Sequence, residues 1–225
     1  MGAAANRDKG DVRPQAAARG HRRGLRRDHD DPLDALVQEA VHGAALATRY
    51  LLGLGHTTVH HVAGPAAWVD AQERVAGWRE ALVRAGAPEA ELFSGDWSSA
   101  SGYRIGHRIA DSNEVTAVFC GNDHMALGLL RALAERGKRV PADVSVVGFD
   151  DIPESAYFLP PLTTVRQDFG ELGRRALAML VDMIDGRMPP TACLRISPHL
   201  VARASAARPD AHRADEAARK DHDDR

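Results

Sequence analysis

Two polar side chains follow apolar runs in the middle of this chain, at points where buried strands would end. The predicted strand 117–120 leads into Gly121-Asn122, and the predicted strand 144–148 leads to Asp150. Open parallel sheets bind ligands beyond the carboxyl ends of their strands. An amide donates and accepts hydrogen bonds and a carboxylate accepts them. Asn122 and Asp150 together therefore favour a ligand that is rich in hydroxyl groups.

An arginine and a tryptophan could belong to the same site. Arg74 lies near the start of a predicted helix, and its guanidinium could bind sugar hydroxyls or an anionic group. The alternative is a surface ion pair with Glu73 or Asp70. Trp97 follows a predicted strand and lies outside any apolar run. An indole in that position can stack on the apolar face of a sugar ring, although packing in the core is the alternative.

Two further carboxylates and two further tryptophans lie near these residues in the sequence, and most of them are expected to have a structural role. Asp123 stands at the start of a predicted helix, where a carboxylate would cap the free backbone N–H groups. We expect Asp151 to be solvated or to act as a cap. Trp78 lies on an amphipathic helical pattern and is expected in the core. Trp68 follows Gly64-Pro65, near the rim of the predicted site.

Helical and extended patterns alternate along most of the chain, which predicts an α/β fold with helices on both faces of a parallel sheet. Helices are expected at 43–54, 69–85, 98–111, 122–136 and 169–185; strands at 57–62, 91–93, 115–120, 144–148, 192–196 and 200–202; and a helical turn at 153–158.

Composition restricts the class of protein. The 225 residues are 44% hydrophobic, which is enough for a core, and a net charge of −2 excludes nucleic-acid binding by bulk charge. Cys120 and Cys193 lie in apolar strand patterns and are expected as buried free thiols. The chain shows neither an apolar run of membrane-spanning length nor a secretory signal. We expect a cytoplasmic protein with no membrane contact.

Catalytic and metal-binding motifs do not appear. The sequence contains no GxSxG, P-loop, HExxH or CxxC pattern. His60 and His61 are adjacent on a predicted strand, so their side chains point to opposite faces and do not chelate one metal together. We expect no catalytic residue, no metal and no cofactor, and hence not an enzyme.

Residues 43–205 carry an ordered set of motifs that resembles the effector-binding domain of the LacI/GalR family of transcription regulators. GDWSSASGY and PPLTTVRQDF are most similar to the lactose-repressor branch of that family. The set also includes the segments GHTTVHHVAGP, ERVAGWREAL, AVFCGNDHMALG and VSVVGFDD.

The resemblance implies a periplasmic-binding-protein-like (type I) fold, present here mainly as the C-terminal subdomain with part of the N-terminal one. It implies that Arg74 contacts the effector and that Phe169 forms an aromatic wall, with simple packing of Phe169 as the alternative. It further implies a small-molecule effector, a sugar or glycoside, and a homodimer. In this family, DNA is bound by a helix-turn-helix head, which residues 1–40 do not show.

The ends of the chain differ from the family. Residues 1–32 form an arginine-rich lead-in expected to be disordered, with a DNA-contacting arm as the alternative; 33–205 form the partial effector domain; and 206–225 form a charged tail expected to be disordered. These features favour a truncated or frame-disrupted repressor. It would keep only one of the two subdomains between which this family binds its ligand. A stand-alone sugar-binding protein, such as a transporter receptor, and a non-functional remnant are the alternatives.

Overall fold

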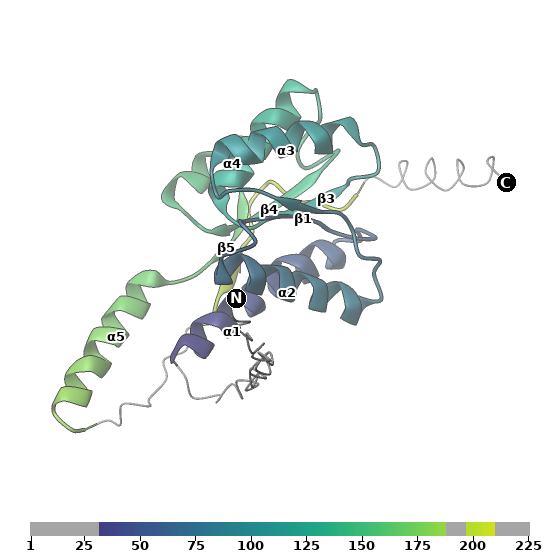
Figure 1. The fold of residues 1–225 in the computed structure, drawn as a ribbon. Coiled ribbons are helices and arrows are strands. Elements are labelled where there is room, and N and C mark those ends of the chain that lie inside the picture. Colours follow the sequence, from purple (N-terminus) through teal and green to yellow (C-terminus); the bar gives the residue numbers. More distant parts are fainter. Residues whose placement is uncertain (1–31, 188–196, 210–225) are drawn as a thin grey trace, which may run out of the picture.

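The computed structural model describes residues 32–187 and 197–209, which form one six-stranded sheet with helices on both faces (Figure 1). The strand order is β2-β1-β3-β4-β5-β6, with β6 alone antiparallel to its neighbour. The strands are β1 (His60–Ala63), β2 (Leu92–Ser94), β3 (Ala117–Cys120), β4 (Ser145–Asp150), β5 (Thr163–Arg166) and β6 (His199–Val201). The predicted α/β class with a parallel sheet is confirmed.

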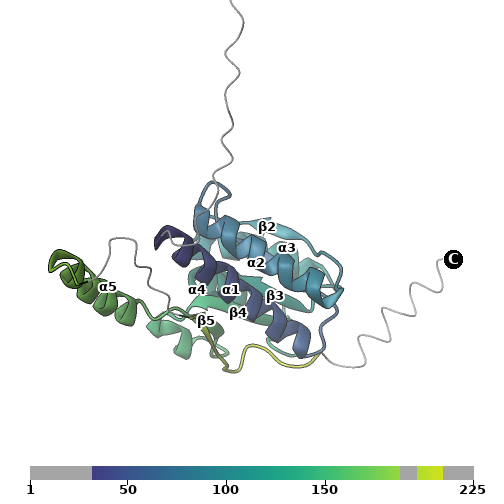
Figure 2. The ribbon, with the colours of Figure 1, turned by 90° about the horizontal axis from the view of Figure 1, so that it is seen from below.

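Two pairs of helices cover the sheet. Helices α1 (Pro32–Gly53) and α2 (Val69–Ala85) lie side by side on one face (Figure 2). Helices α3 (Ser99–Asp111) and α4 (Asp123–Glu135) cover the other face. Helices α3 and α4 approach closely through glycine, because a Cβ on Gly102 would lie 2.0 Å from the carbonyl oxygen of Met125. A short 3-10 helix, η1 (Pro153–Tyr157), follows β4.

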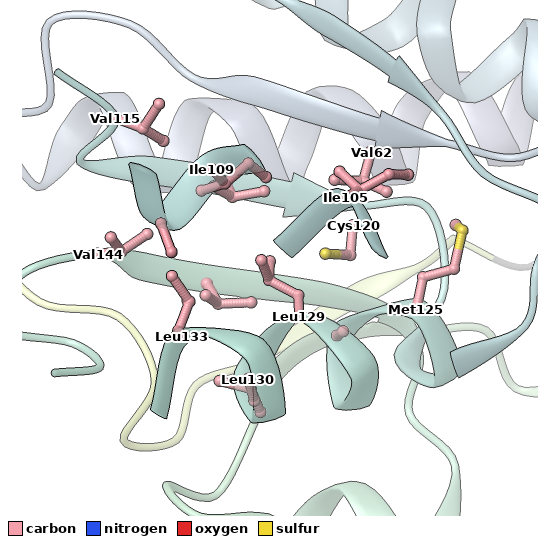
Figure 3. Close-up of a cluster of buried hydrophobic side chains, with 14 of the residues drawn as sticks. Val62, Ile105, Ile109, Val115, Cys120, Met125, Leu129, Leu130, Leu133 and Val144 are labelled. Atoms are coloured by element: carbon pink, nitrogen blue, oxygen red, sulfur yellow. The ribbon is translucent and has the colours of Figure 1, made fainter. Parts of the chain in front are cut away.

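Each face of the sheet has its own hydrophobic core. The core under α3 and α4 contains Val62, Ile105, Leu129 and Val144, all buried (Figure 3). The core under α1 and α2 includes Trp78, which is fully buried and donates its indole N–H to the carbonyl of Val59 at 2.7 Å. The prediction that Trp78 is a core residue is therefore confirmed, and Cys120 is buried as expected.

Two elements differ from the prediction. Helix α1 begins at Pro32 rather than near residue 43. Gly43 does not begin the helix but lies inside it, where it packs against Phe149. Strand β5 was not predicted, because the two prolines before Leu162 masked the β-branched run that forms it. The predicted strand 192–196 lies outside the described residues.

Helix α5 (Phe169–Ile184) extends away from the sheet and its covering helices (Figure 1). Leu177, Leu180, Val181 and Ile184 on this helix are exposed. At the other end of the fold, the carbonyl of Ala207 accepts a hydrogen bond from Ser145 at 3.0 Å. Ordered contacts thus continue slightly past the boundary expected at residue 205. No helix in the described ranges combines the length and apolarity needed to span a bilayer.

Candidate ligand-binding site

Four of the five predicted site residues meet at the carboxyl edge of the sheet. Arg74 comes from α2, Trp97 from the segment after β2, Asn122 from the end of β3, and Asp150 from the end of β4. Parallel strands end on the same edge, so residues far apart in sequence converge there. Direct contacts connect these four residues: Arg74 contacts Asp150 and the Trp97 ring, and the Asn122 side chain binds the backbone carbonyl of Trp97.

Arg74 lies at the centre of this group and is 7% exposed. One terminal nitrogen donates a hydrogen bond to the carbonyl oxygen of Gly121, and the other lies 3.4 Å from Oδ1 of Asp150. The guanidinium carbon lies 4.0 Å from the ring centroid of Phe149 and 5.2 Å from that of Trp97. Cation–π contact with both rings holds the charge where little water reaches it. Its Nε has no hydrogen-bond partner among the described residues.

Asn122 fixes the loop geometry and keeps capacity for a ligand. It is the N-cap of α4, because its Oδ1 accepts a hydrogen bond from the backbone N–H of Met125 at 2.9 Å. Its Nδ2 donates to the carbonyl of Trp97 at 3.0 Å. A side-chain amide has two N–H donors and two acceptor sites. One donor and one acceptor site of Asn122 thus form no hydrogen bond to another described residue.

Trp97 and Asp150 both adopt the left-handed backbone region, with φ of 71° and 99°. Non-glycine residues rarely have positive φ, and such strain concentrates at functional sites. The hydrogen bond from Asn122 holds Trp97 in place. Gly64 makes room for the indole, because a Cβ there would lie 2.1 Å from Cζ2 of Trp97.

Burial raises the pKa of Asp150 to about 6, while the nearby guanidinium of Arg74 opposes that rise. The carboxyl side chain is 24% exposed. It is therefore largely ionised at neutral pH and accessible to a hydroxyl donor. The contact of Asp150 with Arg74 uses Oδ1, and Oδ2 forms no hydrogen bond to a described residue.

The chain is similar to known proteins over most of its length. A family model described as a periplasmic binding protein-like domain matches residues 48–206. The HTH-type transcriptional repressor PurR of Photorhabdus laumondii subsp. laumondii is 39% identical over 178 residues, which make up 78% of this chain and 52% of that protein. PurR of Escherichia coli O1:K1 / APEC is 38% identical over 180 residues, covering 79% of this chain and 53% of that protein.

Solved structures agree with these relatives. A lac repressor dimer bound to operator and the anti-inducer ONPF has a TM-score of 0.70 at 37% identity, covering 75% of this chain and 59% of that chain. A complex of the transcriptional regulator CelR with cellobiose has a TM-score of 0.69 at 37% identity, covering 75% and 52%. The chain belongs to the LacI/GalR family. It carries the effector-binding domain and spans about half the length of the curated relatives it matches.

Two carboxylates beside this LacI/GalR site differ from the prediction. Asp123 does not cap α4, because Asn122 does; its own carboxylate is buried and accepts bonds from Thr164 Oγ1 at 2.6 Å and the Ile152 N–H at 3.0 Å. Asp151 is not solvated. Its side chain is 1% exposed and pairs with two arginines, one of which is Arg203 at 2.7 Å. Through these contacts, both carboxylates brace the loop after β4.

Phe169, the fifth predicted residue, is the first residue of α5, and its side chain lies outside the described part of the structure. Phe149 was not predicted as part of this group, although its ring lies under the guanidinium of Arg74. It lies inside an apolar strand run and has the pattern of an ordinary core residue. The one available signal was its position directly before Asp150, at the carboxyl edge of the sheet.

The histidines of β1 face different surroundings, as the strand pattern predicted. His61 is fully buried, stacks on Phe119 with a centroid distance of 4.5 Å, and makes a 2.9 Å hydrogen bond between its Nδ1 and the Phe119 carbonyl. Burial lowers the pKa of His61 to about 4. The ring of His60 lies near Phe93 instead. These rings serve packing in the LacI/GalR fold.

Proposed function

We propose that this chain binds a sugar or glycoside at the site formed by Arg74, Asn122 and Asp150, with Trp97 and Phe169 as its aromatic walls. The observation that carries the proposal is the Arg74–Asp150 pair beside Asn122. These side chains keep hydrogen-bonding capacity at one edge of the sheet, and sugar hydroxyls both donate and accept. Two solved relatives are described with small molecules, one with the anti-inducer ONPF and one with the sugar cellobiose.

The proposed mechanism is a shift in population between two conformational states of the effector-binding domain. An effector that binds one arrangement of the domain more tightly shifts the population toward it. In a dimer, that shift changes how DNA-binding heads are oriented, which couples effector and operator binding. We propose that this chain acts in the cytoplasm as the non-catalytic sensing part of such a repressor. The solved lac repressor is described as a dimer bound to operator, and we propose homodimerisation here too.

Titration of the purified chain with galactosides, glucosides and free pentoses tests the proposal. Tryptophan fluorescence is a suitable readout, because the ring of Trp97 lies at the site. We expect saturable binding of one class, and a loss of that binding in Asp150→Ala. Asp111→Ala is the matched control, because Asp111 is an exposed carboxylate whose pair with Arg136 lies at the end of α3, outside the site. Absence of binding by a well-folded sample would contradict the proposal.

A further inference from the structure

Trp68 presents a large exposed aromatic surface next to the proposed site. It is 57% exposed, although tryptophan is strongly buried on average. The centroid of its indole lies 6.3 Å from that of Trp97, with an angle of 71° between the ring planes. The two indoles form a corner, in which Trp97 lies toward Arg74 and Trp68 lies toward solvent.

The two indoles differ in how much of their surface a ligand can reach. The guanidinium of Arg74 lies over the ring of Trp97, and Gly64 packs closely against the same indole. A sugar that reaches Asp150 thus meets an aromatic ring that is already in contact with the protein. Trp68, in contrast, is more than half exposed. Of the two tryptophans, it offers the larger free surface for stacking.

The backbone around Trp68 is fixed in place. Its N–H donates to the carbonyl of Pro65 at 2.9 Å, and its carbonyl accepts from the N–H of Gln72 at 3.1 Å. The side chain of Gln72 donates in turn to the carbonyl of Ala66 at 2.8 Å. Trp68 is the N-cap residue of α2, the helix that also carries Arg74. One rigid helix therefore carries both the indole and the guanidinium.

Resting on the proposed function, we propose that Trp68 is an outer subsite for a second ring of the effector. In this arrangement, Asn122 and Asp150 hold the hydroxyls of the first sugar ring. A second ring, joined by a glycosidic bond, stacks on Trp68 through its apolar face, as ring systems do on exposed indoles. The preferred effector is then a glycoside with two rings, a disaccharide or an aryl glycoside, rather than a free monosaccharide.

Matched pairs of ligands test this subsite on the full chain. Glucose is compared with cellobiose and with p-nitrophenyl glucoside, and galactose with lactose and with p-nitrophenyl galactoside, by calorimetry and by ligand-observed saturation-transfer NMR. We expect the two-ring member of one pair to bind about tenfold more tightly, equivalent to ~1.4 kcal/mol. In Trp68→Ala that advantage should disappear, and saturation of the second ring should be lost while the first ring keeps its signal. The disaccharide and aryl arms show which kind of second ring is preferred.

Two further variants keep the test specific. Trp68→Phe retains an aromatic face and should restore part of the advantage. Val83→Ala removes an exposed apolar side chain from the same helix, and should leave the ratio of affinities unchanged. A wild-type chain that binds monosaccharide and two-ring glycoside equally, with no effect of Trp68→Ala, overturns the subsite but leaves the proposed function standing. A folded chain that binds no sugar at all overturns both.

Discussion

A terminal nitrogen of Arg74 lies 3.4 Å from the carboxylate of Asp150, and this contact joins helix α2 to the end of strand β4. The arginine side chain is 9% exposed and the aspartate side chain 24% exposed. The pair therefore sits at the boundary between core and solvent, with its arginine on the core side. In the proposed site, this position leaves the carboxylate of Asp150 partly exposed to a ligand while the guanidinium of Arg74 orients it.

Replacing Arg74 by alanine should destabilise the fold as well as the site. The change leaves the Asp150 carboxylate and the Gly121 carbonyl without their donor, and breaking a buried pair on one side costs about 3 kcal/mol. Urea denaturation measures the free energy of unfolding. Arg79→Ala is the control on the same helix, because its pair with Glu89 is about half exposed and should cost less than ~1 kcal/mol. Equal effects of the two variants would contradict the central role of Arg74.

Gly148 in strand β4 has no room for a side chain. A Cβ there would lie 2.2 Å from Oδ1 of Asp123 and 2.8 Å from Cδ2 of Leu162. We expect Gly148→Ala to lower the free energy of unfolding by roughly 1–3 kcal/mol, as overpacked cores do. Thermal melts compare it with Gly53→Ala, where no atom lies within 4 Å of the added Cβ. That control should be neutral or slightly stabilising.

The sequence predicts the helices, and the convergence of four candidate residues at one edge of the sheet, better than it predicts the boundaries of elements. Helix α2 was predicted at its observed bounds, because its apolar stripe ends at Gly86. The start of α1 was missed, because a glycine inside a helix has the same local pattern as one that begins it. Asn122 and Asp150 were placed by a topological rule that needs only strand ends. The roles of Asp123 and Asp151 could not be predicted, because Thr164 and Arg203 reach them from distant parts of the sequence.

Asp123 should make stability depend on pH. Burial raises its pKa to about 7, above the value near 3.9 of an unfolded aspartate. The folded state then holds a proton that the unfolded state has lost, so this contribution is present below about pH 4 and disappears as the pH rises to about 7. The free-energy difference between wild type and Asp123→Asn, measured by urea denaturation from pH 4 to 8, should change over this range.

The sign of that change is the diagnostic feature. Relative to Asp123→Asn, the wild type should lose stability as the pH rises, by about 1.4 kcal/mol for each pKa unit that separates the folded and unfolded values. A flat profile for Asp123→Asn would contradict this assignment, because it would show that the pKa of the Asp123 carboxyl is not raised in the folded state.

The exposed apolar side chains of α5 should affect self-association more than folding. Leu177 and Ile184 are 64% and 76% exposed. Lysine at both positions should change the free energy of unfolding by less than ~0.5 kcal/mol each, as surface substitutions do. Sedimentation velocity should show less association than in wild type, because exposed apolar patches drive it. Val83→Lys on α2 is the exposed control. A large loss of stability would instead show that these side chains are packed in solution.

Backbone NMR of the isotope-labelled chain, recorded with and without the tightest-binding sugar of the panel, tests the central claim most directly. We expect the largest shift changes at the carboxyl edge of the sheet, in the N–H signals of Arg74, Trp97, Asn122 and Asp150, with little change at the opposite edge. Loss of these changes in Asp150→Ala would complete the result. Shift changes confined to α5 or to the amino edge of the sheet would contradict the assignment of this site.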